Sequence, residues 1–64
     1  MPSALIKSYI YDPAGATLTI IFVSGRAYAY ADAPKDVAEG LRLAFAKVEY
    51  FNKNIRDRFA HSAL

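Results

Sequence analysis

The 64-residue sequence contains no cysteine and no tryptophan, and His61 is its one histidine. Without cysteine the chain has no disulfide, no thiolate nucleophile and no cysteine-based zinc site. Without a second imidazole to share a metal ion, we expect neither a metal site nor a cofactor, and no small-molecule substrate is evident. We interpret His61 as a residue of the C-terminal tail, and Ser62 beside it is too close in sequence to form a nucleophile pair. The sequence therefore predicts that the protein is not an enzyme.

Long hydrophobic runs are also absent. No segment approaches the roughly 20 apolar residues that a membrane span requires. The first seven residues have no apolar run behind a basic region and do not resemble a signal peptide. We therefore expect a soluble, cytoplasmic protein with no membrane contact.

Despite this, the sequence is rich in hydrophobic residues, which make up 55% of it and include five Tyr and four Phe. Residues 1–64 are expected to form one domain, near the lower size limit for a chain without disulfides or metal. So small a core cannot cover all of these aromatic side chains. The composition therefore predicts exposed apolar surface and a homo-oligomer.

Three segments have the composition of β-strands: residues 5–11, residues 17–23 and the run that contains Tyr28 and Tyr30. The first two are separated by Asp12-Pro13-Ala14-Gly15, which has the residue preferences of a type I turn. Two antiparallel strands and a third behind the next turn form a β-meander.

The turn at Ser24-Gly25 decides which way Tyr28 and Tyr30 face. A two-residue hairpin would place both tyrosines on the face of the sheet away from Leu18, Ile20 and Phe22. There they would form a stacking platform for unpaired bases. A three-residue loop with Gly25 in the left-handed region would place them on the same face as those residues, in the core. We favour the three-residue loop, because Ser tolerates a positive φ poorly.

A helical region follows, and Asp32-Ala33-Pro34 is typical of its start. Apolar residues recur at helical spacing from Val37 to Phe59, so the pattern predicts one long helix or two shorter helices in phase. Gly40 lies inside the first half of this helical pattern and is expected to lower helix stability by about 1 kcal/mol relative to Ala. Asn52 is an unfavourable helix residue, and we interpret it as the cap of a second helix after a break near Phe51.

The predicted fold is therefore α+β, with a three-stranded antiparallel β-meander followed by one long or two short C-terminal helices. The helical region is expected to cover one face of the sheet. The predicted core consists of Leu18, Ile20, Phe22, Val37, Leu41, Val48, Phe51 and Ile55.

At this point the chain resembles the KTSC domain, a short module named for the C-terminus of some lysyl-tRNA synthetases and also found as a small bacterial or phage protein. The resemblance is carried by Tyr11-Asp12, Leu18, Phe22, Ser24-Gly25, Tyr28, Tyr30, Pro34, Ala44, Tyr50-Phe51-Asn52 and Ile55-Arg56. Of these, we interpret the following as structural: Tyr11, Asp12, Phe22, Gly25, Tyr28, Tyr30, Pro34, Phe51, Asn52 and Ile55. The family has no established activity, and the resemblance implies RNA binding only through the attachment to a tRNA-charging enzyme. Where the family tends to have Ser-x-Gly, this chain has Ala46-Lys47-Val48, which favours one extended helix.

The charges are unevenly distributed, because the chain from Arg42 onward has five cationic residues against two acidic ones. An RNA partner is expected to meet this basic region. The candidate nucleic-acid-binding residues are Lys47, Tyr50, Lys53, Arg56 and Arg58. The alternative is that these charges form a solvated helix face.

A second hypothesis is a self-associating or protein-binding module with no nucleic-acid role. It would use an extended helix or the sheet face away from the helices. The residues of that face are Thr19, Ile21, Val23, Ala27 and Ala29.

Overall fold

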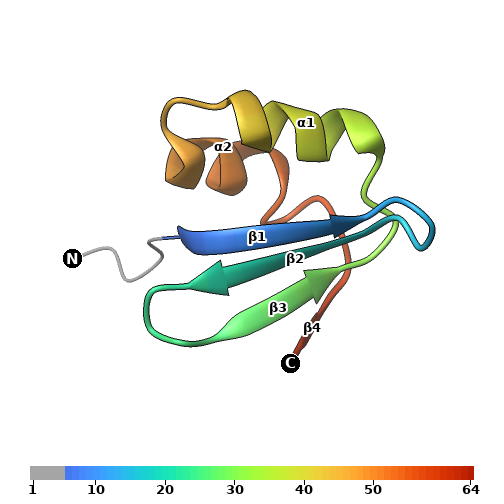
Figure 1. Cartoon of the computed structure of the whole chain (residues 1–64), viewed down its shortest axis with the longest axis horizontal. Helices are drawn as coiled ribbons and strands as arrows, with labels where there is room; N and C mark the ends of the chain where they lie inside the picture. Colours follow the sequence, from blue (N-terminus) through green and yellow to red (C-terminus); the bar gives the residue numbers. More distant parts are fainter. Residues whose placement is uncertain (1–5) are drawn as a thin grey trace.

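The fold consists of one antiparallel sheet and two short helices. The computed structural model describes residues 6–64, and the part of the expected first strand that falls on residue 5 lies outside them. In chain order the elements are β1 (Ile6–Asp12), β2 (Thr17–Phe22), β3 (Ala27–Tyr30), α1 (Lys35–Leu43), α2 (Lys47–Asn54) and β4 (His61–Ala63). The sheet order is β1-β2-β3-β4, and both helices lie on the same face of the sheet (Figure 1). The predicted α+β class and the β-meander are confirmed.

The loop between β2 and β3 turns the tyrosines of β3 toward the helices. Gly25 has a φ of 96°, and its N–H donates to the carbonyl of Phe22 at 2.9 Å. The N–H of Phe22 donates to the carbonyl of Arg26 at 2.8 Å, which closes a three-residue loop. Tyr28 consequently lies opposite Ile20, and Tyr30 lies opposite Leu18. The three-residue loop predicted from the sequence is confirmed, and both tyrosines share a face with the core residues of β2.

The turn after Asp12 is also confirmed, although its strained residue is not a glycine. Asp12 pairs with Thr17 across the two strands, and its Oδ1 accepts a hydrogen bond from the N–H of Ala14 at 3.1 Å. Positive φ falls on Ala16, at 51°. Ala16 also accepts a hydrogen bond from the N–H of Ala33 through its carbonyl, at 2.8 Å. This contact holds the turn against the segment that leads into α1.

The helical region consists of two short helices, which is the second of the two alternatives that the periodicity left open. α1 ends at Leu43, and Ala44 and Ala46 both have extended backbone conformations. α2 then runs through Asn52 to Asn54 without a break near Phe51, so Asn52 does not cap a second helix. The residue before α2 is Ala46, which makes no side-chain capping hydrogen bond. The apolar spacing stays in phase across the break, which is why periodicity alone did not reveal it.

A fourth strand, which the sequence analysis did not predict, closes the other edge of the sheet. His61 pairs with Tyr30 and Ala63 pairs with Tyr28. The N–H of Ala31 donates to the carbonyl of Ala60 at 2.8 Å, which extends the pairing beyond the strand. His61 is therefore a strand residue and not part of a loose tail, and the chain leaves helical structure at residue 54.

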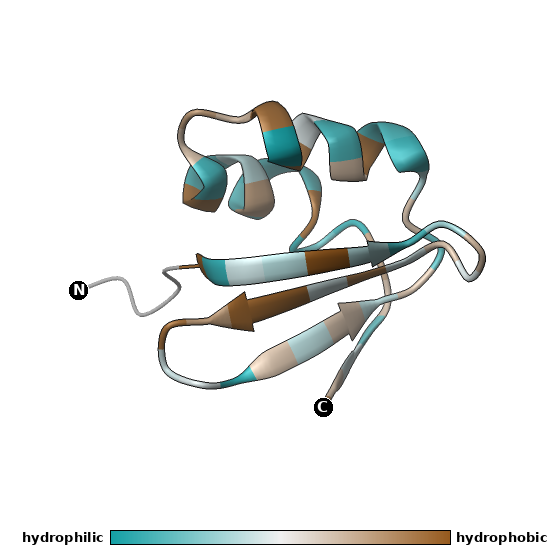
Figure 2. Cartoon of the chain, in the orientation of Figure 1, coloured by the Kyte–Doolittle hydropathy of each residue, from teal (hydrophilic) through white to brown (hydrophobic). Residues whose placement is uncertain are grey.

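The core lies between β2, β3 and the two helices. Its buried residues are Leu18, Ile20, Phe22, Tyr30, Ala33, Ala38, Leu41, Phe51 and Ile55. Most of the predicted core is confirmed, but Val37 is half-buried against it, and Val48 is half-buried outside it. Figure 2 shows hydrophobic residues running along β2, the strand that both helices and both neighbouring strands protect. The helices leave the opposite face of the sheet uncovered (Figure 1).

Candidate nucleic-acid interface

Three of the predicted cationic residues are exposed at the end of α2 and in the turn that follows it. Lys53 lies in the last turn of α2, and Arg56 and Arg58 lie in the turn that leads to β4. All three side chains are exposed. Among residues 6–64, one ion pair forms within 4.0 Å, and it joins Arg42 to Glu39 on α1. Lys53, Arg56 and Arg58, hereafter the basic surface, therefore keep their charges free of protein carboxylates.

The Arg42–Glu39 pair neutralises the charge at the end of α1. The Nε and Nη2 atoms of Arg42 donate to the two carboxylate oxygens of Glu39. The hydrogen bond from Arg42 lowers the pKa of Glu39, and the same bond raises the pKa of Arg42. Both side chains are exposed to solvent, so the pair adds little to the stability of the fold.

Lys47 occupies a different position from the basic surface, because its ammonium group caps the end of α1. The Nζ atom donates to the carbonyls of Leu41 at 3.0 Å, Arg42 at 3.1 Å and Ala44 at 3.1 Å. The last carbonyls of a helix have no partners within it and carry partial negative charge, so a cation there is stabilising. All three donors of this ammonium group are thus directed at the protein's own backbone.

Tyr50 holds the two helices together. Its hydroxyl donates to the carbonyl of Val37 at 3.0 Å, from α2 to α1. Its ring lies so close to Gly40 that a Cβ atom built there would come within 2.6 Å of Cζ and 2.9 Å of Cε2. Gly40 is therefore required for close approach, which explains a glycine in a helix interior. Tyr50 is half-buried against the hydrophobic core, so its ring is held in place by the fold.

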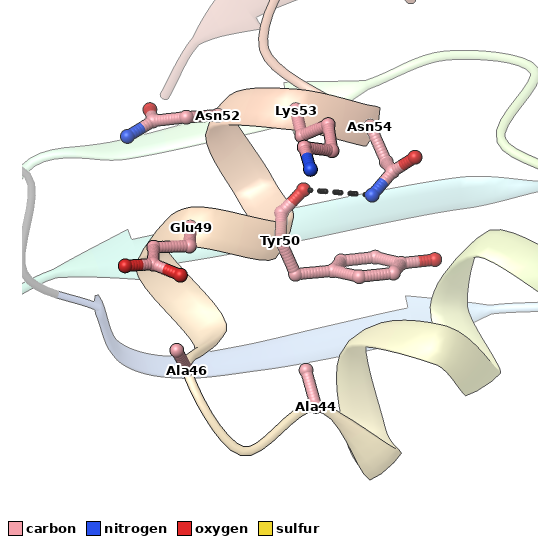
Figure 3. Close-up of a pocket in the computed structure, with 7 residues that line it drawn as sticks. All are labelled: Ala44, Ala46, Glu49, Tyr50, Asn52, Lys53 and Asn54. Atoms are coloured by element: carbon pink, nitrogen blue, oxygen red, sulfur yellow. Dashed lines mark hydrogen bonds between the residues drawn. The ribbon is translucent and has the colours of Figure 1, made fainter.

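An open groove of about 640 Å³ runs along α2 beside the break between the helices. Figure 3 shows its lining side chains, with the Tyr50 ring extending from α2 toward α1. The lining residues are Ala44, Ala46, Glu49, Tyr50, Asn52, Lys53 and Asn54. The structure thus brings the predicted residues Tyr50 and Lys53 into one groove and leaves Arg56 and Arg58 in the adjoining turn.

The aromatic residues of β3 and β4 form a cluster next to Arg56. The rings of Tyr30 and His61 have centroids 5.1 Å apart, and Tyr28 contacts His61 edge to face at 5.7 Å. Burial raises the pKa of Tyr30, with a further contribution from Tyr28, and the positive charge of Arg56 opposes this rise. Arg56 therefore lies within electrostatic reach of the edge of the sheet.

Most of the residues that carry the family resemblance have structural positions. The Tyr11 hydroxyl donates to the carbonyl of Ala33 at 2.8 Å, and Pro34 precedes α1. Phe51 makes edge-to-face contacts with Phe22 and Tyr30, with ring centroids 5.6 Å apart in both pairs. Ile55 is fully buried. Asn52 differs from these residues, because its side chain is exposed and lines the groove.

Sequence reasoning did not identify Glu49, Asn54 or Gly40 as parts of this site. Glu49 and Lys53 lie four residues apart, a spacing that places them on one helix face. That signal was available once α2 was recognised as a helix. The pairing of Gly40 with Tyr50 had no signal in the sequence, because it depends on how two helices cross.

Two classes of site are absent from the part of the chain that the structure describes. No group of three or more histidine, cysteine or acidic side chains is arranged to hold a metal ion. None of the helices within residues 6–64 has the length and apolar character needed to span a membrane.

Comparison with known proteins gives consistent results at the level of sequence and fold. The family model described as the KTSC domain matches residues 2–59. The chain is 41% identical over 61 residues to a lysine-tRNA ligase from Nostoc sp. and 39% identical over 61 residues to one from Nostoc punctiforme. Each match covers 95% of this chain but only 11% of the ligase. The crystal structure of a KTSC domain protein from Yersinia pestis has a TM-score of 0.88 and 28% identity, covering 100% of this chain and 90% of that one.

Proposed function

The chain belongs to the KTSC family, and 95% of it aligns with segments of lysine-tRNA ligases at 39–41% identity. We propose that it is a non-catalytic RNA-binding module. The basic surface of Lys53, Arg56 and Arg58 contacts the phosphate backbone. Each phosphate that a cationic side chain neutralises releases counterions, which favours binding and makes it dependent on salt.

The observation that supports this proposal is that the cations of the basic surface form no ion pairs with protein carboxylates. Its three cations are exposed and pair with no carboxylate within the described residues. Lys47, by contrast, donates to three carbonyls and is assigned to the cap of α1, so we do not include it among the phosphate contacts.

RNA binding is tested with a labelled tRNA and an unrelated single-stranded RNA, each titrated at several salt concentrations. We expect the wild-type affinity to fall linearly with salt on a logarithmic plot. The double variant Lys53→Glu, Arg56→Glu should weaken binding by about tenfold or more at low salt and flatten the salt dependence.

A matched control separates the effect of the basic surface on RNA affinity from the effect of net charge. Lys7 and Lys35 are exposed and lie on β1 and at the start of α1. The variant Lys7→Glu, Lys35→Glu changes the formal net charge from +2 to −2, as the first double variant does. The control should lose much less affinity, and an equal loss in both variants, or no binding at low salt, would overturn the proposal.

Self-association is the second candidate, and exposed apolar side chains favour it. Ile10 is 60% exposed and Val23 is 61% exposed, at the uncovered sheet face and the end of β2. A module of this kind should associate more strongly as salt rises and dissociate in Ile21→Lys. Since α1 ends at Leu43, this second candidate rests on the sheet face and not on an extended helix.

A further inference from the structure

The groove along α2 is lined by groups that recognise nucleotides in proteins. It is an open, shallow hollow of about 640 Å³ and not an enclosed pocket. One aromatic ring, two amides, one carboxylate and one ammonium group line it, together with two alanines (Figure 3). These are the groups that stack on a base, bond to its edge and contact a phosphate.

The aromatic ring in this groove is held in place before any ligand arrives. The hydrogen bond from the Tyr50 hydroxyl to the Val37 carbonyl fixes one end of the side chain. The close approach to Gly40 fixes the ring laterally. A ring that is immobilised by the fold loses little conformational entropy on binding, so it suits the stacking of an unpaired base.

The polar groups of the groove are oriented and have bonding capacity left. Nδ2 of Asn54 donates to the backbone carbonyl of Tyr50 at 3.3 Å, which directs Oδ1 outward as an acceptor. Glu49 and Lys53 form no ion pair within 4.0 Å in the described structure, although they lie one helical turn apart. The carboxylate and the ammonium group are therefore both available to a ligand.

We propose that this groove binds one unpaired nucleotide whose base carries an exocyclic amino group. The base stacks on Tyr50, its amino group donates to the Glu49 carboxylate, and Lys53 contacts the phosphate. This assignment rests on the proposed RNA-binding function and adds base selectivity to it, with cytosine and adenine preferred over uracil because uracil has no exocyclic amino group.

The composition of the chain provides a direct readout of this groove. Asn52 and Asn54 are the only carboxamide side chains in the sequence, which has no glutamine, and both line the groove. Their side-chain NH₂ signals in a ¹⁵N-correlated NMR spectrum therefore report on the site alone. The full-length protein is titrated with CMP, AMP, UMP and ribose 5-phosphate at constant ionic strength.

We expect saturable shifts of these amide signals with CMP and AMP, several-fold weaker binding of UMP, and no comparable shift with ribose 5-phosphate. Equal shifts with ribose 5-phosphate would mean that Lys53 binds phosphate and the groove does not bind a base. No shift with any nucleotide, in a protein that still binds RNA, would overturn this inference and leave the proposed function standing. Shifts with CMP in a protein that binds no RNA would overturn the RNA-binding function instead.

Two variants test the assigned roles. Glu49→Ala removes the carboxylate to which the base amino group donates, and because Glu49 is exposed the variant should fold normally. It should also bind CMP and UMP with equal affinity, and retained selectivity would exclude the role of Glu49. Tyr50→Phe keeps the ring and should keep most of the CMP affinity, whereas Tyr50→Leu should lose it several-fold, with folding confirmed by the backbone spectrum.

Discussion

Gly40 shows how one residue in this chain is determined by a residue on a different element. In isolation, a glycine in the middle of α1 destabilises the helix by about 1 kcal/mol relative to alanine. The ring of Tyr50 occupies the space that a Cβ atom would need. Removing the methyl group allows the α2 tyrosine to reach the Val37 carbonyl and join the two helices.

The first prediction concerns Gly40→Ala. The new methyl group collides with a ring that cannot move without breaking its hydrogen bond, so we expect a net loss of about 1–3 kcal/mol in the free energy of unfolding despite the better helix propensity. Chemical denaturation measures it. Gly15→Ala is the control, since a Cβ at that position meets nothing closer than 3.4 Å; a stabilised Gly40→Ala protein would contradict the packing described.

At the same scale, residue chemistry determined how much of the structure was predictable. Ser24 tolerates positive φ poorly and Gly25 adopts it readily, so the loop and the inward direction of Tyr30 followed from the sequence. Ala16 adopts a positive φ although alanine has no preference for that conformation, so the sequence did not predict it. Gly40 was recognised as unfavourable, but its reason lies ten residues away in a helix whose orientation the sequence does not encode locally.

Among the elements, the break between α1 and α2 depends on a side chain that follows it. Ala44-Phe45-Ala46 contains neither glycine nor proline, so no residue in it ends a helix by its own conformational preference. The ammonium group of Lys47 instead satisfies three carbonyls at the end of α1. The chain uses a cation from the next helix where a glycine at the end of α1 would often serve.

The second prediction follows from this cap. Lys47→Met keeps the length of the side chain but removes the charge and the donors, so we expect a loss of about 1–2 kcal/mol in stability and weaker amide protection at the end of α1. Hydrogen exchange monitored by NMR locates the loss. Lys53→Met, which alters an exposed lysine without such bonds, should change stability by no more than about 0.5 kcal/mol; equal losses in the two variants would refute the capping role.

β4 was not predicted from the sequence, because its own residues carry no signal for a strand. Its three residues are all exposed and include a histidine, a serine and an alanine, so they show neither alternation nor β-branched composition. The strand forms because the edge of β3 has free backbone groups and the turn after α2 returns the chain beside it. The candidate basic residues were found from charge alone, whereas the groove that Lys53 lines could not be recognised without the positions of both helices.

For the molecule as a whole, Tyr30 lies where the layers meet. It pairs with Leu18 of β2 and His61 of β4 and packs against Phe51 of α2. Its side chain is 3% exposed, and burial raises its pKa above the ordinary value. The folded state therefore resists ionisation of this phenol more than the unfolded state does.

A third prediction concerns alkaline stability. Below the ordinary tyrosine pKa of about 10 the phenol is neutral in both states, and its contribution to stability is fully present. As pH rises above this value, the unfolded state loses the proton first and stability falls. Tyr30→Phe should therefore lose stability less steeply than the wild type above about pH 10, as measured by urea denaturation at a series of pH values; parallel slopes would contradict the burial described.

The exposed loop between the helices has a consequence for proteolysis. Phe45 is fully exposed between Ala44 and Ala46, whose backbones are both extended, so the loop is accessible to a protease with a preference for aromatic residues. Cleavage there divides the chain into a piece with β1, β2, β3 and α1 and a piece of 19 residues, 46–64, that carries α2, β4 and the basic surface. Since Phe51 and Ile55 of the shorter piece are buried in the core, the two pieces should remain associated after the cut and reassemble from separate peptides.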